Sequence, residues 1–377
     1  MNRRERLMAT LRGEPVDRPA VRFYQIGGHL VNRNDPDPFN IYNHPTWHPL
    51  LQLAEEKTDL IMMYPPQVCR PAVAHDAEFW HTEKYLQAGS KFTRTTLSIA
   101  GRTMTSLTRR DPDVETIWTL EHLLKDEDDL RAYLALPEAP TQMPVDIAPL
   151  LAAERELGDR GIIMVDTVDP LCLAAELFSL ADYTVLAFTQ RALFHKLLEK
   201  LAQPLYAQTG VLAQKFPGHL WRICGPEYAT EPYLPPELFN EYVVRYTGPM
   251  VDMIQCYGGF ARIHCHGRIR NVLPFFQQMG ASAIDPIEPP PQGNITLAEV
   301  RRDYGRDFVL FGNLESSDIE NLAPSEFEKI VARSLRDGTT GPGRGFVLMP
   351  SAAPYGRIIT LQTMTNYETI IRLVEAI

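Results

Sequence analysis

Two histidines separated by one residue follow a short apolar run. Residues 261–267 read ARIHCHG, so three metal-capable side chains precede a glycine. A buried parallel strand has this pattern where it enters a loop that carries chemistry. Because side chains of a strand alternate between its faces, we expect His264 and His266 on one face and Cys265 on the other. Two imidazoles on one face can hold a metal ion or exchange a proton, unless one is a core residue and the other lies at the surface.

The elements that must position these histidines alternate between strands and helices. Eight apolar runs predict strands near residues 21, 60, 163, 222, 262, 283, 309 and 347, and helical patterns separate the later ones. Eight such units predict an α/β fold, a (β/α)8 TIM barrel that forms a single domain over residues 1–377 with an N-terminal extension. The alternative is an open doubly wound sheet, but no GxGxxG motif follows the first strand.

Two further elements are predicted between the second and third strands of the barrel. Threonine and arginine alternate with apolar residues over about 91–109, which predicts a β-hairpin insertion. The pattern over 120–136 predicts a helix that carries an acidic, solvated face.

Composition excludes several classes of protein. The 377 residues are 45% apolar and 22% charged, which is enough apolar material for a sizeable core. A net charge of −10 without a basic run argues against nucleic-acid binding. No stretch approaches the ~20 apolar residues of a membrane span, and no signal-peptide core follows the charged start. Five cysteines without a CxxC motif indicate free thiols, so we expect a cytoplasmic protein.

Polar side chains follow the predicted strands at the end of the barrel where active sites lie. Consecutive strands from 220–224 onward bring carboxylates or imidazoles to this end: Glu227, His264, His266, Glu288 and Glu315. A set of two histidines and one glutamate, or of one histidine and two glutamates, suits a catalytic zinc ion that polarises a substrate oxygen or nitrogen. Without metal, the same set can transfer protons, with carboxylates raising the pKa of a histidine.

These polar residues also have structural interpretations. Glu227 can form an ion pair with an arginine, and Glu288 can anchor the turn before three prolines. Glu315 precedes Ser-Ser-Asp, a pattern typical of a helix start, so it can act as a cap. Asp166 can be a turn residue, and His29, which follows two glycines, can be an ordinary loop residue.

The order of short motifs resembles that of the uroporphyrinogen decarboxylase superfamily. This superfamily includes the haem-pathway decarboxylase and cobalamin-dependent methyltransferases, which share a barrel. The resemblance covers nearly the whole chain and begins with RER at 4–6 and LRGEPVDRP at 11–19. The later motifs in the same order are CGPE at 224–227, HCHG at 264–267, DPIEP at 285–289, FGN at 311–313 and GFVL at 345–348.

Two departures from this superfamily bear on function. The haem-pathway decarboxylase carries Met-Arg-Gln-Ala-Gly-Arg after its first strand to grip the carboxylates of its substrate. Here residues 22–29 read RFYQIGGH, and Arg22 alone is too little cation for an octa-acid. The methyltransferases often show His-x-Cys-Gly after the fifth strand and a second zinc-binding cysteine after the eighth. Here His266 takes the place of the first cysteine, and residues 351–353 contain no second one.

The resemblance implies a methyltransferase that moves a methyl group from a small O-, N- or S-methylated compound to a corrinoid on a partner protein. It also implies one zinc ion per chain that activates the leaving group. Relatives with carboxylate- and histidine-rich sites suggest Glu227 and His264 as zinc ligands, then His266 and Glu288, with Glu241 as a further candidate.

The remaining predicted roles complete this interpretation. Asp166 and Tyr24 would assist catalysis together with His264 and Glu227. The predicted cofactor-binding residues, which follow different strands, are Asn313, Tyr228 and His29.

Other functions stay open. The first alternative is a decarboxylase or other lyase that acts on a small carboxylic acid by acid/base chemistry. The second is a non-catalytic binding or corrinoid-reactivation protein. In each case the inserted hairpin is a candidate homodimer contact, and Cys265 is expected to be a packing residue.

Overall fold

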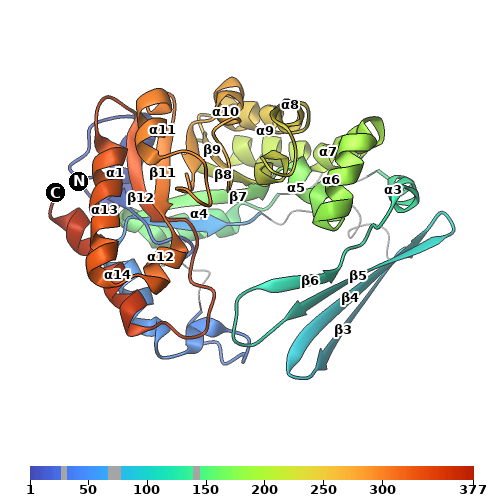
Figure 1. Ribbon diagram of the computed structural model, residues 1–377, viewed down its shortest axis with the longest axis horizontal. Helices are drawn as coiled ribbons and strands as arrows, with labels where there is room; N and C mark the ends of the chain where they lie inside the picture. The colour runs from blue at the N-terminus through green and yellow to red at the C-terminus, as the bar shows by residue number, and fades with distance from the viewer. Residues whose placement is uncertain (27–31, 67–77, 139–144) are drawn as a thin grey trace.

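Eight parallel strands lie side by side in one curled sheet (Figure 1). The computed structural model describes residues 1–26, 32–66, 78–138 and 145–377. The order of the strands in the sheet is β1, β12, β11, β10, β9, β8, β7 and β2. Read from the β2 end, the strands follow chain order up to β12, and β1 lies beside β12. Their bounds are β1 Ala20–Val21, β2 Leu60–Tyr64, β7 Gly161–Val168, β8 Leu220–Cys224, β9 Phe260–His264, β10 Ala283–Asp285, β11 Val309–Leu314 and β12 Gly345–Pro350. All eight predicted strands are confirmed.

Asp59 joins the two ends of the strand order and so completes the ring. Its backbone N–H donates to the carbonyl of Val21 at 2.7 Å, and its carboxylate accepts the N–H of Val21 at 2.9 Å. The same carboxylate binds Arg6 at 2.5 Å and Arg18 at 3.0 Å. Asp59 is fully buried, so these partners replace water completely. The predicted (β/α)8 barrel is thereby confirmed.

The N-terminal helix α1 (Arg3–Arg12) packs against the interior of the barrel. It begins with a capping box between Asn2 and Glu5 and ends at Gly13, whose left-handed backbone has φ +73. Leu7 and Leu11 join the apolar cluster formed by inward-facing strand residues. This end of the barrel is therefore apolar, and polar side chains lie farther along the strands.

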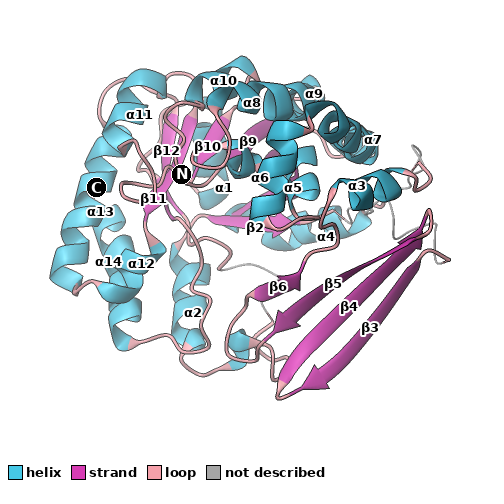
Figure 2. Cartoon of the chain, turned by 45° about the vertical axis from the view of Figure 1, so that its right-hand side comes forward, coloured by secondary structure: helices cyan, strands magenta, loops and turns pink. Residues whose placement is uncertain are grey.

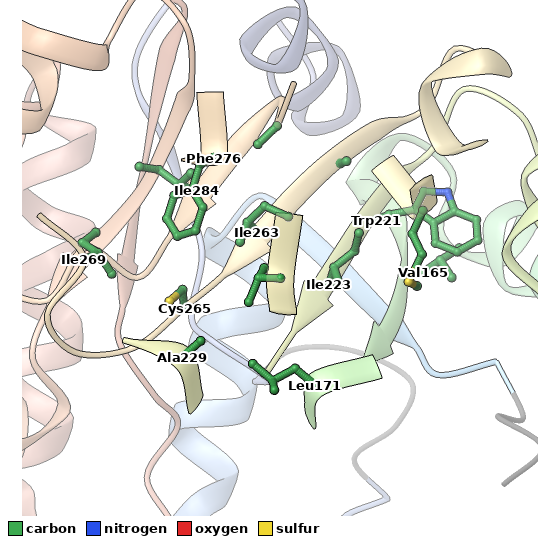
Figure 3. Close-up of a cluster of buried hydrophobic side chains, with 14 of the residues drawn as sticks. Val165, Leu171, Trp221, Ile223, Ala229, Ile263, Cys265, Ile269, Phe276 and Ile284 are labelled. Atoms are coloured by element: carbon green, nitrogen blue, oxygen red, sulfur yellow. The ribbon is translucent and has the colours of Figure 1, made fainter. Parts of the chain in front are cut away.

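Helices surround the sheet and bury its outward face (Figure 1). Figure 3 shows Trp221, Ile223, Ile263 and Cys265 within this outer apolar layer. Cys265 thus points away from the two histidines that flank it, which confirms the prediction that it is a packing residue. The helices are α2 Trp47–Lys57, α4 Ala148–Leu157, α5 Pro170–Ala175, α6 Leu180–Thr189, α7 Arg191–Lys215, α8 Pro236–Phe239, α9 Arg245–Cys256, α10 Leu273–Gln278, α11 Leu297–Tyr304, α12 Ser316–Asn321, α13 Pro324–Thr339 and α14 Leu361–Glu375.

The insertion is larger than the predicted hairpin. It is a four-stranded antiparallel sheet of β3 (Trp80–Gln87), β4 (Ser90–Ile99), β5 (Arg102–Arg110) and β6 (Ile117–Glu121), which projects beside the barrel (Figure 2). The hairpin predicted at 91–109 is its central pair. The outer strands were missed because β3 is mostly polar and exposed, whereas β6 exposes its apolar residues.

The predicted helix at 120–136 is shorter than expected. Helix α3 spans Glu127–Leu134, because Asp126 caps it by accepting the N–H of Asp129. The acidic cluster is not merely solvated, since Asp129 is buried and accepts a hydrogen bond from Arg102 of β5 at 2.8 Å. Elsewhere in the described ranges, no helix has the length and apolar character that a membrane crossing requires.

Candidate active site

His264 and Asp285 end two neighbouring strands, β9 and β10, and stand opposite each other in register. The Nδ1 of His264 lies 2.8 Å from Oδ2 of Asp285. Burial lowers the pKa of His264 to about 4, despite the opposing effect of this carboxylate. Burial alone would raise the pKa of Asp285, but Arg262 and His264 together hold it well below its ordinary value. A neutral imidazole therefore donates Nδ1–H to Asp285, which leaves the lone pair on Nε2.

His266 and Glu288 form a second couple directly beside the first. The Nδ1 of His266 lies 2.7 Å from Oε1 of Glu288, whose Oε2 accepts the N–H of Gly267 at 2.6 Å. Burial opposes protonation of His266, but Glu288 raises the pKa of this histidine above its ordinary value. The ring centroids of His264 and His266 are 4.6 Å apart, and the rings are nearly perpendicular. The site thus combines a neutral imidazole with one that readily carries a proton.

Glu227 lies in a 3₁₀ turn that follows β8. Its Oε2 accepts the N–H of Gly225 at 3.1 Å, and burial raises the pKa of this carboxyl. Gly225 has φ +120, and a Cβ there would lie 2.3 Å from Cβ of Cys172 and 2.6 Å from Oδ1 of Asp169. Only glycine allows the chain to turn this closely over α5 and bring Glu227 to the site. The neighbouring Tyr228 packs edge-on against the ring of Tyr183.

An arginine of β8, Arg222, links Asp166 to Tyr24, and Tyr24 in turn contacts His264. Arg222 forms two hydrogen bonds with Asp166, at 2.5 and 3.0 Å, and donates a third to the hydroxyl of Tyr24. The Tyr24 ring stacks on His264 with centroids 5.9 Å apart. Burial raises the pKa of Asp166, and the guanidinium groups of Arg262 and Arg22 act in the opposite direction. This fixed network orients Tyr24 against the imidazole.

Glu315 and Asn313 bring two unpaired acceptors from β11 and the residue that follows it. Glu315 is 6% exposed, and burial together with the charge of Glu288 raises its pKa to about 7. The hydroxyl of Ser351 donates to Oε2 of Glu315 at 3.4 Å. Oε1 of Glu315 and Oδ1 of Asn313 are buried without a hydrogen-bond partner among the described residues. Glu315 occupies the N-cap position of α12, but its side chain makes no capping hydrogen bond.

The predicted zinc ligands are only partly brought together. His264 and His266 lie side by side, and the carboxylate on Nδ1 of each is the partner that metal-bound histidines usually have. Glu288 instead supports His266, because both of its oxygens are engaged. Glu241 is not part of this site, since it binds Arg191 and His195 of α7. Within the described ranges, no three His, Cys, Asp or Glu side chains form a group that could hold a metal ion.

Sequence reasoning missed some partners of the site residues. One predicted site residue, His29, lies outside the described residues. The pairing of Asp285 with His264, and of Arg222 with Asp166 and Tyr24, was not predicted. For Arg222 the signal that could have found it is its position two residues before the end of β8, because alternate strand residues share one face. For Asp285 the signal is a carboxylate as the last residue of a buried strand, β10.

Comparisons with known proteins agree with this architecture. The family model for uroporphyrinogen decarboxylase (URO-D) matches residues 115–377, which is more than half of the chain. The chain belongs to the uroporphyrinogen decarboxylase family. No curated protein matches it significantly.

Among solved structures, a methyltransferase from Methanosarcina mazei is similar over 100% of this chain and 99% of its own, with 14% identity and a TM-score of 0.62. At that identity the likeness shows the fold alone. A D-psicose 3-epimerase crystallised with D-fructose has 12% identity and a TM-score of 0.32, and covers 61% of this chain and 84% of its own. A Bacteroides ovatus GH5 xyloglucanase has 9% identity and a TM-score of 0.32, and covers 78% and 94%.

Proposed function

We propose that this protein is a methyltransferase that moves a methyl group from a small O-, N- or S-methylated compound to a corrinoid. One observation carries the proposal: two histidine–carboxylate couples, His264–Asp285 and His266–Glu288, lie with their rings 4.6 Å apart at the end of β9. The barrel shared over the whole chain with the methyltransferase from Methanosarcina mazei is a fold that can carry out this class of reaction.

The chemistry follows from what the transfer must accomplish. The bond between the methyl carbon and its heteroatom would break with the heteroatom keeping the electron pair, and the Co(I) of the corrinoid acceptor would supply the pair for the new bond to carbon. That heteroatom is a poor leaving group unless its developing charge is neutralised. His266 supplies a proton for this purpose, because Glu288 favours its imidazolium form. Glu315, whose pKa is raised to about 7, is a second proton donor on the same edge.

A zinc ion remains part of the proposal, although the described residues fit it incompletely. Zinc would bind Nε2 of His264 and, once that histidine has lost its proton, Nε2 of His266, and Glu227 is the predicted third ligand. When bound, zinc would polarise the leaving heteroatom as a Lewis acid. Because no third ligand is in place among the described residues, the proton-transfer roles above are assigned to the protein's own side chains.

The test measures methyl transfer to reduced free cobalamin through the change in the absorbance of the cobalamin. Methyl ethers, methylamines and thioethers serve as methyl donors. We expect turnover with one donor class, and a loss of about 100-fold or more in His264→Ala and His266→Ala. His81→Ala, on the exposed β3 strand, is the matched control and should keep full activity. Zinc content should be measured in the same three variants. Absence of transfer from every donor class would contradict the proposal.

A decarboxylase acting on a small carboxylic acid is the second candidate. Three arginines inside the barrel, Arg22, Arg222 and Arg262, favour it because they are chemically suited to an acid. Release of carbon dioxide from small acids, without methyl transfer, would support this candidate over the first.

The proposed function also concerns the binding partners of the protein and its location in the cell. We propose that the corrinoid is carried by a partner protein and that the insertion sheet forms a homodimer contact. The sheet supports this contact because Ile117, Trp118 and Leu120 of β6 are exposed. Light scattering of wild type and Trp118→Glu would test it, with a monomeric wild type contradicting it.

A cytoplasmic location remains a prediction, and it is supported by free thiols at Cys172, Cys224, Cys256 and Cys265.

A further inference from the structure

We propose that the interior of the barrel binds a small carboxylate between Arg22 and Arg262. Arg22 directly follows β1, and its backbone N–H continues the sheet by bonding to Leu348 of β12 at 3.0 Å. Arg262 lies within β9, on the same strand face as His264. The two arginines are 2% and 0% exposed, so protein atoms surround both guanidinium groups.

The first support is a set of donors without acceptors. Nε and Nη1 of Arg22, and all three guanidinium nitrogens of Arg262, have no hydrogen-bond partner among the described residues. Nε of Arg262 is 3.0 Å from Oδ1 of Asp285, but the two are not aligned as a hydrogen bond. Buried polar groups are almost always paired in folded proteins, and the one unpaired acceptor beside Arg262, Oδ1 of Asp285, is too little for these five nitrogens. A carboxylate presents two oxygens that accept such N–H groups in a forked arrangement.

The second support is charge. Three guanidinium groups share this layer with two carboxylates, Asp166 and Asp285. Asp166 is held by Arg222 through two hydrogen bonds, and Asp285 faces Arg262. Both carboxylates act on Arg22 from a distance, but neither forms an ion pair with it. Burial and the nearby guanidinium groups of Arg262 and Arg222 depress the pKa of Arg22 strongly. Arginine does not lose its proton in proteins, so one bound anion restores the balance.

The position of Arg22 connects this anion to the histidine pair. The Arg22 guanidinium lies 5.7 Å from the centre of the Tyr24 ring, and the same ring stacks on His264. A ligand whose carboxylate reaches Arg22 would therefore extend past Tyr24 toward His264. Given the proposed function, on which this step depends, the methyl donor is a methylated carboxylic acid.

This carboxylate site differs from the one that the haem-pathway decarboxylase uses. When Gln25 and Gly27 are matched to the glutamine and glycine of Met-Arg-Gln-Ala-Gly-Arg, its two arginines fall on Tyr24 and Gly28. Arg22 and Arg262 therefore belong to neither of those positions.

The test measures binding, which requires no turnover. Full-length protein in chloride-free buffer is titrated with acetate and methoxyacetate, and with acetamide and methoxyacetamide as neutral matches, by thermal shift and calorimetry. We expect the acids to raise the melting temperature and the amides to leave it unchanged. Arg22→Met should weaken acid binding by about 10- to 100-fold, because hydrogen bonds to a charged group are lost. Arg302→Met, at an exposed arginine of α11, is the matched control and should bind acids as wild type does.

The other outcomes contradict either the inference or the proposed function, and they can be told apart. Equal binding of acids and amides, or unchanged acid binding in Arg22→Met, would exclude Arg22 as the site. Equal stabilisation by chloride, bromide and the acids would show an inorganic structural ion instead of a substrate carboxylate. Should Arg22→Met fail to fold, the comparison of acids with amides in wild type still decides. Acid binding without methyl transfer would refute only the proposed function, and transfer from neutral donors at equal rates would refute only this inference.

Discussion

At the scale of single residues, the two histidines differ in charge although both pair with carboxylates. His264 is 5% exposed and has Arg222 nearby, so burial prevails over Asp285 and the ring stays neutral. His266 has 37% of its side chain exposed, and its couple with Glu288 favours the protonated ring. A neutral base and a protonated acid side by side are what a reaction that moves a leaving group needs.

The buried neutral state of His264 predicts a specific pH dependence of stability. Its pKa is about 4 in the folded protein against an ordinary 6.5, so the unfolded chain binds the proton first as pH falls. Stability is therefore complete above pH 6.5 and is lost between pH 6.5 and 4, by about 3 kcal/mol for this group. In His264→Gln this loss should disappear. Urea unfolding of both proteins at pH 7.5 and 4.5 measures it.

The pH dependence of His264→Gln must be compared with that of wild type, because other titratable groups change the stability in the opposite direction as pH falls. Glu315 has its pKa raised to about 7, so it costs stability as pH rises. It is present in both proteins, and its effect cancels in the difference. An unchanged difference between the two pH values in His264→Gln would show that His264 is protonated in the folded state.

Sequence reasoning named most residues that the candidate site contains, but not how they pair with one another. The triplet at 264–266 was recognised because its alternation on a strand is a local property. The pairing of His266 with Glu288 depends on how the loop after β10 folds back, which no local pattern specifies. The same holds for Arg222, since its link between Asp166 and Tyr24 spans three strands.

At the scale of elements, the strands of the barrel were predictable and the insertion was not. Barrel strands are buried on both faces, so they are short apolar runs between turn residues. The inserted strands β3 and β6 belong to a sheet with exposed faces, and their mixed composition resembles loop or helix. The turn after β8 is a third case, because its shape depends on one glycine packed against another element.

Gly225 provides a prediction at this scale. In Gly225→Ala the new methyl group would collide with Cys172 and Asp169, and the φ of +120 would add strain. We expect a loss of at least ~2 kcal/mol in unfolding free energy together with displacement of Glu227. Gly218→Ala is the matched control, because Gly218 has φ +77 but open space around it, so it should cost only about 1 kcal/mol. Urea unfolding measures both, and equal costs would contradict the predicted collision.

At the scale of the whole molecule, a single carboxylate joins the first and last strands of the sheet order. Asp59 binds Arg6 of α1, Arg18 and the backbone of Val21, so it ties the N-terminal helix, the first strand and β2 together. No local sequence pattern marks this residue, because its partners come from a helix, a loop and a strand that are distant from it in the sequence. A barrel closed by such an ionic contact depends on keeping every charge in it paired.

Removing this carboxylate should therefore weaken the entire barrel. Asp59→Ala removes the buried acceptor that Arg6, Arg18 and the N–H of Val21 share, and we expect it to lower the unfolding free energy by about 3–5 kcal/mol. Asp17→Ala is the matched control: Asp17 also binds Arg6, but it is 41% exposed in its side chain, so its loss should cost about 1 kcal/mol or less. Chemical unfolding followed by tryptophan fluorescence compares the two, since Trp47 and Trp221 lie in the barrel's outer apolar layer. If both variants lose the same stability, closure rests on apolar packing by α1 and not on the buried carboxylate.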